Sequence, residues 1–198
     1  MRIITVIVII IFLLLMPSGY YGFRQMTDLP QWYNEEENAR ECAHLVMQSQ
    51  KLRQQIAHGK IPVELSNDDL SGLILSEITR FSKKDDGQPI KGIQTQIYPD
   101  HILIDLILNV HALDTGRLDK DLSKRIHQLQ TWLPRSSLQQ LPLKLRLIPE
   151  RDGALIRWHK DSFLKIGALR FPLNKVSSLA RHFPVVDFEL AENRVLLK

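Results

Sequence analysis

The spacing of hydrophobic and polar residues changes along the chain. Residues 3–16 form an unbroken apolar run, residues 34–81 place apolar side chains three or four positions apart, and several later segments alternate between apolar and polar. Unbroken apolar runs are typical of membrane segments. Apolar residues three or four positions apart are typical of helices, and alternation of apolar and polar residues is typical of strands. The sequence therefore predicts an α+β fold, with an N-terminal transmembrane helix followed by helices packed on a curved, mainly antiparallel sheet.

The apolar run Ile3–Met16 is short for a membrane span, but no charge follows it before Arg24. As a helix, Ile3–Phe23 would be about 31 Å long at roughly 1.5 Å per residue, close to the thickness of the hydrocarbon core of a bilayer. Aromatic side chains near its end suit the membrane interface. The predicted anchor residues are Ile3, Phe12, Leu15, Tyr20, Tyr21 and Phe23.

A cleaved signal peptide is the alternative to a permanent anchor. Bulky residues occupy the positions where a cleavage site needs small ones, so an uncleaved anchor is favoured. Arg2 places the N-terminus in the cytoplasm by the positive-inside rule, and the remainder on the extracytoplasmic side. The predicted organisation is a membrane anchor or uncleaved signal over residues 1–24, a juxtamembrane helix over 25–62 and an extracytoplasmic α+β domain over 63–198.

Two helices are predicted before the alternation begins. The first, Asn34–Ala57, starts with three glutamates and carries an apolar stripe that includes Cys42. It would act as a stalk, as a coiled-coil contact or as a helix packed on the domain, and we favour packing. The second begins at Ser66, which forms a capping-box pattern with Asp69. Its apolar stripe consists of Leu70, Leu73, Ile74, Ile78 and Phe81.

The strongest strand signal is His101–Ala112, where every even position is apolar. Other strands are predicted at Ile93–Ile97, Leu141–Leu147, Ala154–Lys160 and Phe163–Phe171, with a hairpin turn at Asp152-Gly153. A closing hairpin joins Val185–Leu190 to Val195–Leu197. Two further helices are expected, at Leu118–Leu133 and Asn174–His182.

The apolar face of His101–Ala112 needs a cover. Its five large side chains represent about 7–15 kcal/mol of burial as an upper bound. The cover is either a helix or a lipid chain, and the sequence leaves both open. The candidate ligand-binding residues are therefore Ile102, Ile104, Leu106, Leu108 and Val110 from this strand, with Leu70 and Ile74 from the helix.

Charge is distributed unevenly along the chain. Residues 1–116 hold 10 Lys+Arg against 14 Asp+Glu, a net charge of −4, and residues 117–198 hold 16 against 8, a net charge of +8. The basic part is a solvated surface or a face for anionic lipid. No basic cluster is interleaved with aromatics, so nucleic acid is not an expected partner. Cys42 is the single cysteine, which excludes an intramolecular disulfide.

No catalytic, phosphate-binding or metal motif occurs in the sequence. His101, Asp105 and His111 share a face of the predicted strand, but its two histidines would lie about 33 Å apart and could not bind one metal ion. Trp158 reads as a core side chain, with an interfacial contact to lipid headgroups as the alternative. We assign no catalytic residue, metal or cofactor, and the sequence favours a non-enzymatic protein without deciding the question.

Leu65–Ile74 and Ile166–Pro172 resemble two motifs of the YpmS-like family of membrane-anchored bacterial envelope proteins. Leu65–Ile74 is similar to the family's Leu-Thr/Ser-x-x-Asp-Leu-Asn-x-Leu-Ile helix motif, with Ser71 at the Asn position, and Ile166–Pro172 is similar to its Ile-Gly-x-Leu-x-Leu-Pro segment. The likeness covers roughly residues 60–198. The family pattern is similar to tubular lipid-binding domains, in which a curved sheet wraps a long helix around an apolar groove. The resemblance implies lipid binding by analogy of fold.

We therefore expect a membrane-tethered extracytoplasmic domain that binds a lipid or other apolar ligand without catalysis. The alternative is a scaffold or accessory subunit of a membrane or envelope protein complex, recognised through the basic part or the helix Asn34–Ala57. The expected partners are the membrane, through one N-terminal span, and either a lipid ligand or a membrane protein.

Overall fold

The structure is a computed structural model of the whole chain. It describes residues 28–57, 63–82, 87–117, 134–152, 155–173 and 188–197, together with Ser123, His127, Gln130 and Thr131. The anchor predicted over residues 1–24 lies outside these ranges and stays a prediction. No helix within the described ranges combines the length and the apolar character of a membrane span.

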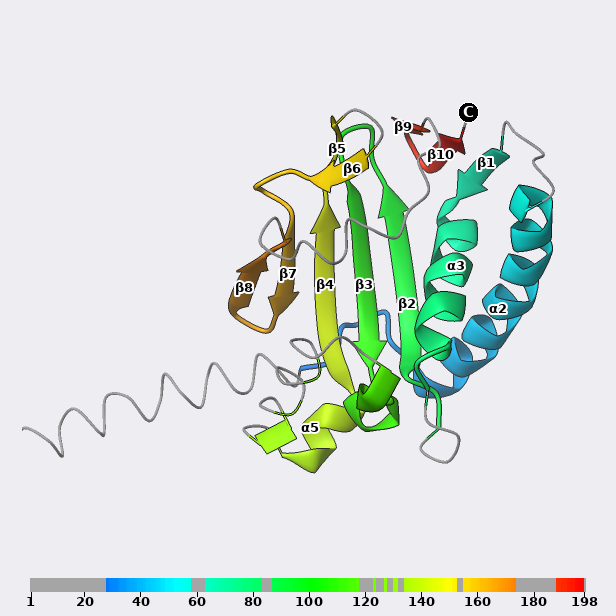
Figure 1. Cartoon of the computed structure of the whole chain (residues 1–198). Coiled ribbons are helices and arrows are strands. Elements are labelled where there is room, and N and C mark those ends of the chain that lie inside the picture. The colour runs from blue at the N-terminus through cyan, green and yellow to red at the C-terminus, as the bar shows by residue number, and fades with distance from the viewer. Residues whose placement is uncertain are drawn as a thin grey trace, which may run out of the picture.

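A five-stranded antiparallel sheet forms the centre of the fold (Figure 1). The order of its strands is β2-β3-β4-β7-β8. The strands are β2 (Ile90–Ile97), β3 (Ile102–Leu108), β4 (Leu141–Leu147), β7 (Phe163–Ile166) and β8 (Leu169–Pro172). The predicted α+β class with a mainly antiparallel sheet is confirmed.

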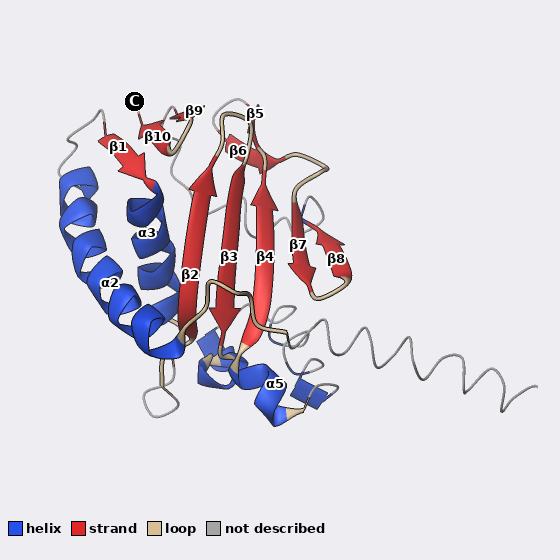
Figure 2. Ribbon diagram, turned by 180° about the vertical axis from the view of Figure 1, so that it is seen from behind, coloured by secondary structure: helices blue, strands red, loops and turns tan. Residues whose placement is uncertain are grey.

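Helices α2 (Glu35–Ala57) and α3 (Asn67–Thr79) stand beside strand β2, with α3 between β2 and much of α2 (Figures 1 and 2). Cys42 and Leu45 of α2 belong to the same buried cluster as Ile93 of β2, so the favoured interpretation of α2 as a packed helix is confirmed. The capping box of α3 is also confirmed. Ser66 Oγ accepts from Asp69 N at 3.2 Å, and Asp69 Oδ2 accepts from Ser66 N at 3.0 Å.

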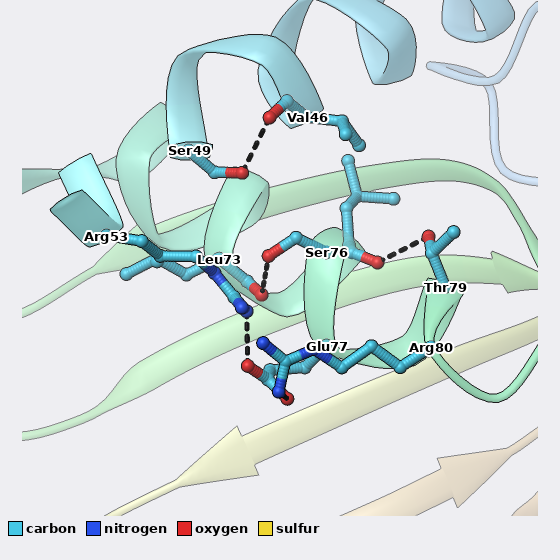
Figure 3. Close-up of polar contacts among 9 residues, drawn as sticks. Val46, Ser49, Arg53, Leu73, Ser76, Glu77, Thr79 and Arg80 are labelled. Carbon is cyan, nitrogen blue, oxygen red and sulfur yellow. Dashed lines mark hydrogen bonds and ion pairs between the residues drawn. The ribbon is translucent and has the colours of Figure 1, made fainter. Parts of the chain in front are cut away.

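The two helices approach each other closely at Gly72. A Cβ atom there would lie 2.6 Å from the backbone oxygen of Leu45, so only glycine fits. Nearby hydroxyl groups bond back to carbonyls of their own helices, as Ser49 does to Val46 O at 2.7 Å (Figure 3). An ion pair between Arg53 and Glu77 links the helices at the surface (Figure 3).

The buried residues of helix α3 differ from those of the predicted apolar stripe. Ser71, Gly72 and Leu75 are its buried residues, whereas Leu70 and Ile74 are only partly buried. The reason is that α3 packs on two sides at once. Gly72 faces α2, while Ser71 Oγ donates a hydrogen bond to Thr95 Oγ1 of β2 at 2.8 Å.

Two smaller sheets complete the described fold. The first has the order β1-β10-β9, from β1 (Val63–Ser66), β9 (Phe188–Ala191) and β10 (Arg194–Leu197). Its β9–β10 hairpin was predicted, but β1 was not. The second pairs β5 (Pro149–Asp152) with β6 (Leu155–Trp158) on the two sides of the predicted hairpin turn, but β5 itself was not predicted as a strand.

The predicted strand His101–Ala112 is too long at its end. Strand β3 stops at Leu108, because the Asn109 side chain accepts from His111 N at 3.2 Å and opens the 3-10 helix η1 (Val110–Ala112). Val110 and Ala112 are therefore buried outside the strand. A second 3-10 helix, η2 (Thr115–Arg117), follows it, and the short helix α5 (Arg135–Gln139) precedes β4.

The predicted single strand Phe163–Phe171 is wrong, because the segment is the hairpin of β7 and β8. Gly167, with a φ of 56°, reverses the chain between them. The apolar positions of the predicted helix Leu118–Leu133 and the whole predicted helix Asn174–His182 lie outside the described residues.

Candidate functional site

One apolar face runs across all five strands of the central sheet. Residues directly opposite one another in antiparallel strands point to the same face. The register therefore aligns Thr95, Ile104, Leu145, Leu164 and Phe171 in a single row from β2 to β8. This row carries no charged residue, so the whole width of the face calls for a cover.

The cover of this row decreases from one edge of the sheet to the other. Thr95 and Ile104 are only 5% and 4% exposed, and Ile104 belongs to one buried cluster with residues of α2 and α3. Leu145 and Leu164 are half-buried, and Phe171 is 40% exposed. The apolar face is thus closed over β2 and β3 and partly open over β4, β7 and β8.

Most of the predicted ligand-binding residues lie on the closed side. Ile102, Ile104 and Leu106 are at most 9% exposed and belong to one buried cluster with residues of α2 and α3. Leu70, Ile74 and Leu108 are partly buried against that cluster. Val110 is separate, because it packs in a second cluster with Leu113, Leu138, Leu141 and Ile166.

The opposite face of the sheet gathers basic side chains. The register aligns Asp105, Lys144, Lys165 and Arg170 on it. Lys144 Nζ lies 3.2 Å from Asp105 Oδ2, and the Arg170 guanidinium lies 3.8 Å from the ring centroid of Phe163. Among the described residues no carboxylate pairs with Lys165 or Arg170. Three basic side chains from the second part of the sequence therefore lie in one row across β4, β7 and β8.

The structure does not bring together the His and Asp side chains that share a face of the predicted strand. The His101 ring stacks on Tyr98, with ring centroids 4.6 Å apart, and its Nδ1 lies 2.6 Å from Asp100 Oδ1. This hydrogen bond lowers the pKa of Asp100. Asp105 pairs with Lys144 on another part of the sheet. Within the described ranges, no three His, Cys, Asp or Glu side chains are placed to hold a metal ion.

Cys42 is 3% exposed and packs on the sheet-facing side of α2, as expected for a small apolar side chain. Burial, with a smaller contribution from Glu41, raises the pKa of its thiol to about 11. The thiol is therefore neutral at physiological pH and a poor nucleophile.

A polar cavity of about 520 Å³ lies at the edge of β2 and was not predicted. It is lined from α2, α3, β2 and the β9–β10 turn, by Glu41, Leu45, Asn67, Asp68, Ser71, Ile93, Gln94, Thr95, Gln96, Ile97, Tyr98, Glu192 and Asn193. Its lining residues come from segments far apart in the sequence. No single segment carries enough of the lining for a local pattern to indicate the cavity.

In comparison with known proteins, no family model, no curated protein and no solved structure matches this chain. The resemblance to the YpmS-like family thus stays an expectation that depends on its two motifs. In the structure, Leu65–Ile74 covers the end of β1 and the first half of α3, and Ile166–Pro172 covers the β7–β8 turn and strand β8.

Proposed function

We propose that this chain is a membrane-tethered extracytoplasmic domain of the cell envelope that binds a lipid or other apolar ligand and is not an enzyme. The observation that supports it is the row Thr95–Ile104–Leu145–Leu164–Phe171, whose cover thins toward β8. An apolar chain laid over the open half would remove partly exposed leucines and Phe171 from water, which gives about 25 cal/mol for each Å² buried.

The proposed site differs in position from the predicted groove. Its walls are Leu145, Leu147, Leu164 and Phe171, which are half-buried or exposed. The predicted binding residues Ile102, Ile104 and Leu106 would form its closed end, since they lie in one cluster with residues of α2 and α3. In this proposal, the predicted N-terminal transmembrane helix keeps the open half of a curved sheet beside a bilayer that supplies the ligand.

The test uses the full chain in phospholipid nanodiscs that contain a phospholipid with a photoreactive diazirine in its acyl chain. After irradiation, peptide mapping should place crosslinks on β4 and on the β7–β8 hairpin. The variant Leu164→Asp/Phe171→Asp should lose most of these crosslinks, because a carboxylate against an acyl chain is strongly disfavoured.

The control is Met47→Asp, which introduces a single carboxylate on α2 at a side chain that is 69% exposed. It should leave the crosslinks on the hairpin unchanged. Crosslinks confined to residues 1–24, with none in β4, β7 or β8, would refute apolar ligand binding.

A second candidate function is an accessory subunit of a membrane protein complex. Two observations favour it. Met47 is exposed on α2, and Lys165 and Arg170 lie opposite each other on the basic face of β7 and β8. Crosslinking in native membranes should then give a stoichiometric protein partner that is lost in Lys165→Glu/Arg170→Glu. If crosslinking yields no stoichiometric partner, this candidate is excluded.

A further inference from the structure

The described stretch before α2, residues 28–34, crosses the face of the sheet that carries the basic row of β4, β7 and β8, which we call the basic face. In the register Gln94 stands opposite Asp105, a member of that row. Gly92, two positions before Gln94, faces the same side. A Cβ atom at Gly92 would lie 3.0 Å from the ring of Tyr33. The stretch therefore packs on the basic face and not on the apolar one.

The stretch runs from α2 toward the β4 side of the sheet. At the start of α2, Glu35 Oε2 accepts a hydrogen bond at 3.2 Å from Nε2 of Gln140, just before β4. Figures 1 and 2 show the stretch crossing β2 and β3 and ending at Asp28 near β4. The chain that precedes Asp28 therefore joins the domain on the basic face, close to the strands that carry Lys144 and Lys165.

The link between this point and the predicted anchor is short. The anchor is predicted over residues 1–24, so four Cα–Cα steps separate Arg24 from Asp28. At no more than roughly 3.6 Å for each step, they span at most about 14 Å. An uncleaved anchor would therefore hold the basic face of the sheet close to the headgroups of its own bilayer.

The basic face carries positive charge that the described residues do not neutralise. Its row of Asp105, Lys144, Lys165 and Arg170 has three cations and one carboxylate, and that carboxylate pairs with Lys144 at 3.2 Å. Lys165 and Arg170 are exposed, and among the described residues no carboxylate pairs with them. The Arg170 guanidinium lies 3.8 Å from the ring centroid of Phe163. Neighbouring strands are about 4.8 Å apart, so these cations can act together on one anionic surface.

We propose that the basic face rests on the anionic phospholipid headgroups of the bilayer that holds the anchor, with Lys165 and Arg170 donating to headgroup phosphates. Exposed basic side chains next to a membrane anchor are attracted to anionic lipid. A bilayer is favoured over a protein partner because the short link brings the membrane to this face in every copy of the chain. The inference rests on the membrane tether of the proposed function and not on its apolar ligand.

This contact also orients the apolar row. Phe171 points to the opposite face from Arg170, and both belong to β8, the edge strand of the sheet. A lipid drawn from the bilayer would then reach the partly open half around the β8 edge and not through the sheet.

The test measures how fast single lysines of the full chain are acetylated in nanodiscs, with peptide mass spectrometry as the readout. One nanodisc is pure phosphatidylcholine, and the other has equal parts of phosphatidylcholine and phosphatidylglycerol. Lys144 and Lys165 should react at least about threefold more slowly in the anionic nanodisc. Lys51, exposed on α2, should change little. In 0.5 M NaCl, where the Debye length is about 4 Å, the difference should largely disappear.

A pair of variants separates this face from general charge attraction. In Lys165→Gln/Arg170→Gln, the remaining lysine of the row, Lys144, should lose its slower acetylation in the anionic nanodisc. The control Arg40→Gln/Lys51→Gln removes one Lys and one Arg from exposed positions of α2 and should leave the protection of Lys144 unchanged. Circular dichroism checks that both variants fold as the parent chain does.

Four results would overturn the proposal. If the chain enters the nanodiscs but Lys165 reacts equally fast in both lipids, the tether stands and the contact does not. If the chain does not enter the nanodiscs, the tether itself is wrong. An equal loss of Lys144 protection in the control variant would mean non-specific attraction. Protection in native membranes alone, absent from nanodiscs of the purified chain, would assign the face to a protein partner.

Discussion

Strands β2 and β3 at one end of the sheet and strands β7 and β8 at the other contribute to the same apolar face, but their surroundings differ. Ile104 of β3 is 4% exposed and lies in one buried cluster with residues of α2 and α3, while Phe171 of β8, in the same row, is 40% exposed. Similar residue types therefore hold the fold together at one end and remain accessible at the other. An alternating pattern thus indicates that a face needs a cover, and it does not say what covers it.

The largest expected effect comes from core truncation at the covered end. Ile104→Ala should lower the free energy of unfolding by about 2–5 kcal/mol, because it leaves a cavity in a closed core. Phe171→Ala at the open end should cost less than about 1 kcal/mol. Urea denaturation of the full chain in detergent, followed by circular dichroism, measures both. Equal losses would remove the distinction between the two ends.

The second prediction concerns the helix pair that provides the cover. Gly72→Ala should destabilise the domain by about 1–3 kcal/mol, because the new Cβ would press on the backbone oxygen of Leu45 and force the helices apart. Ser76→Ala, on the same helix, is the control and should stay within about 0.5 kcal/mol of the parent chain. A fully stable Gly72→Ala variant would mean that α2 and α3 are not closely packed.

The third prediction concerns the contact of this cover with the sheet. Ser71→Ala should cost about 1–2 kcal/mol, because it leaves the buried Thr95 hydroxyl without its partner. Adding Thr95→Val should recover part of that loss, since neither polar group is then buried alone. The double-mutant cycle is read from the same urea curves, and strictly additive losses would show that the two hydroxyls do not interact.

The smallest effect is expected where α2 contacts both parts of the sheet. Glu35 Oε1 lies 2.7 Å from Nζ of Lys91 in β2, and Gln140 Nε2, just before β4, donates to Glu35 Oε2 at 3.2 Å. The hydrogen bond and charge of Lys91 lower the pKa of Glu35. The stabilisation is therefore present above the ordinary glutamate pKa of 4.5 and is lost as the pH falls through the lower folded value.

Because the Glu35 side chain is 59% exposed, solvent and salt limit the effect to less than about 1 kcal/mol. Urea midpoints at pH 6 and pH 3 should differ less for Glu35→Gln than for the parent chain. Glu36→Gln is the control, since its 4.0 Å pair with Arg40 is almost fully exposed. An unchanged pH dependence in Glu35→Gln would contradict the prediction.

Features determined by neighbouring residues were predictable from the sequence. The capping box of Ser66 and Asp69 spans three positions, and the alternation of Leu141–Leu147 directly follows from the pleat of a strand. The errors arose where one residue overrides a pattern. Asn109 ends β3 although the apolar alternation continues beyond it, and Gly167 reverses the chain within an apparently continuous strand.

The features that were missed depend on contacts between distant segments. The cavity at Thr95 needs α2, α3, β2 and the β9–β10 turn to come together. The residues predicted to line an apolar groove were placed correctly on one face of β3, as far as Leu108. Their burial in one cluster with residues of α2 and α3 depends on the close packing of these helices at Gly72 and Leu45. The spacing of residues along the sequence does not indicate that packing.

The pairing of β1 with β10 has a consequence for how the chain assembles. Glu64 and Arg194, which also form an ion pair at 3.1 Å, are 130 residues apart in sequence. Ser66 in β1 is also the N-cap of α3, so an early helix starts on a strand whose partner is synthesised much later. Contacts between distant segments close large loops and form slowly.

Leu65 is 4% exposed in the complete fold, but until β10 arrives the strand beside it is unpaired. Until β10 is synthesised, the first part of the domain therefore has an unpaired strand edge. Unpaired edges of this kind favour intermolecular strand pairing and aggregation. The β1–β10 pairing makes completion of the domain a late step and gives a chaperone or a neighbouring chain a defined interval in which to act.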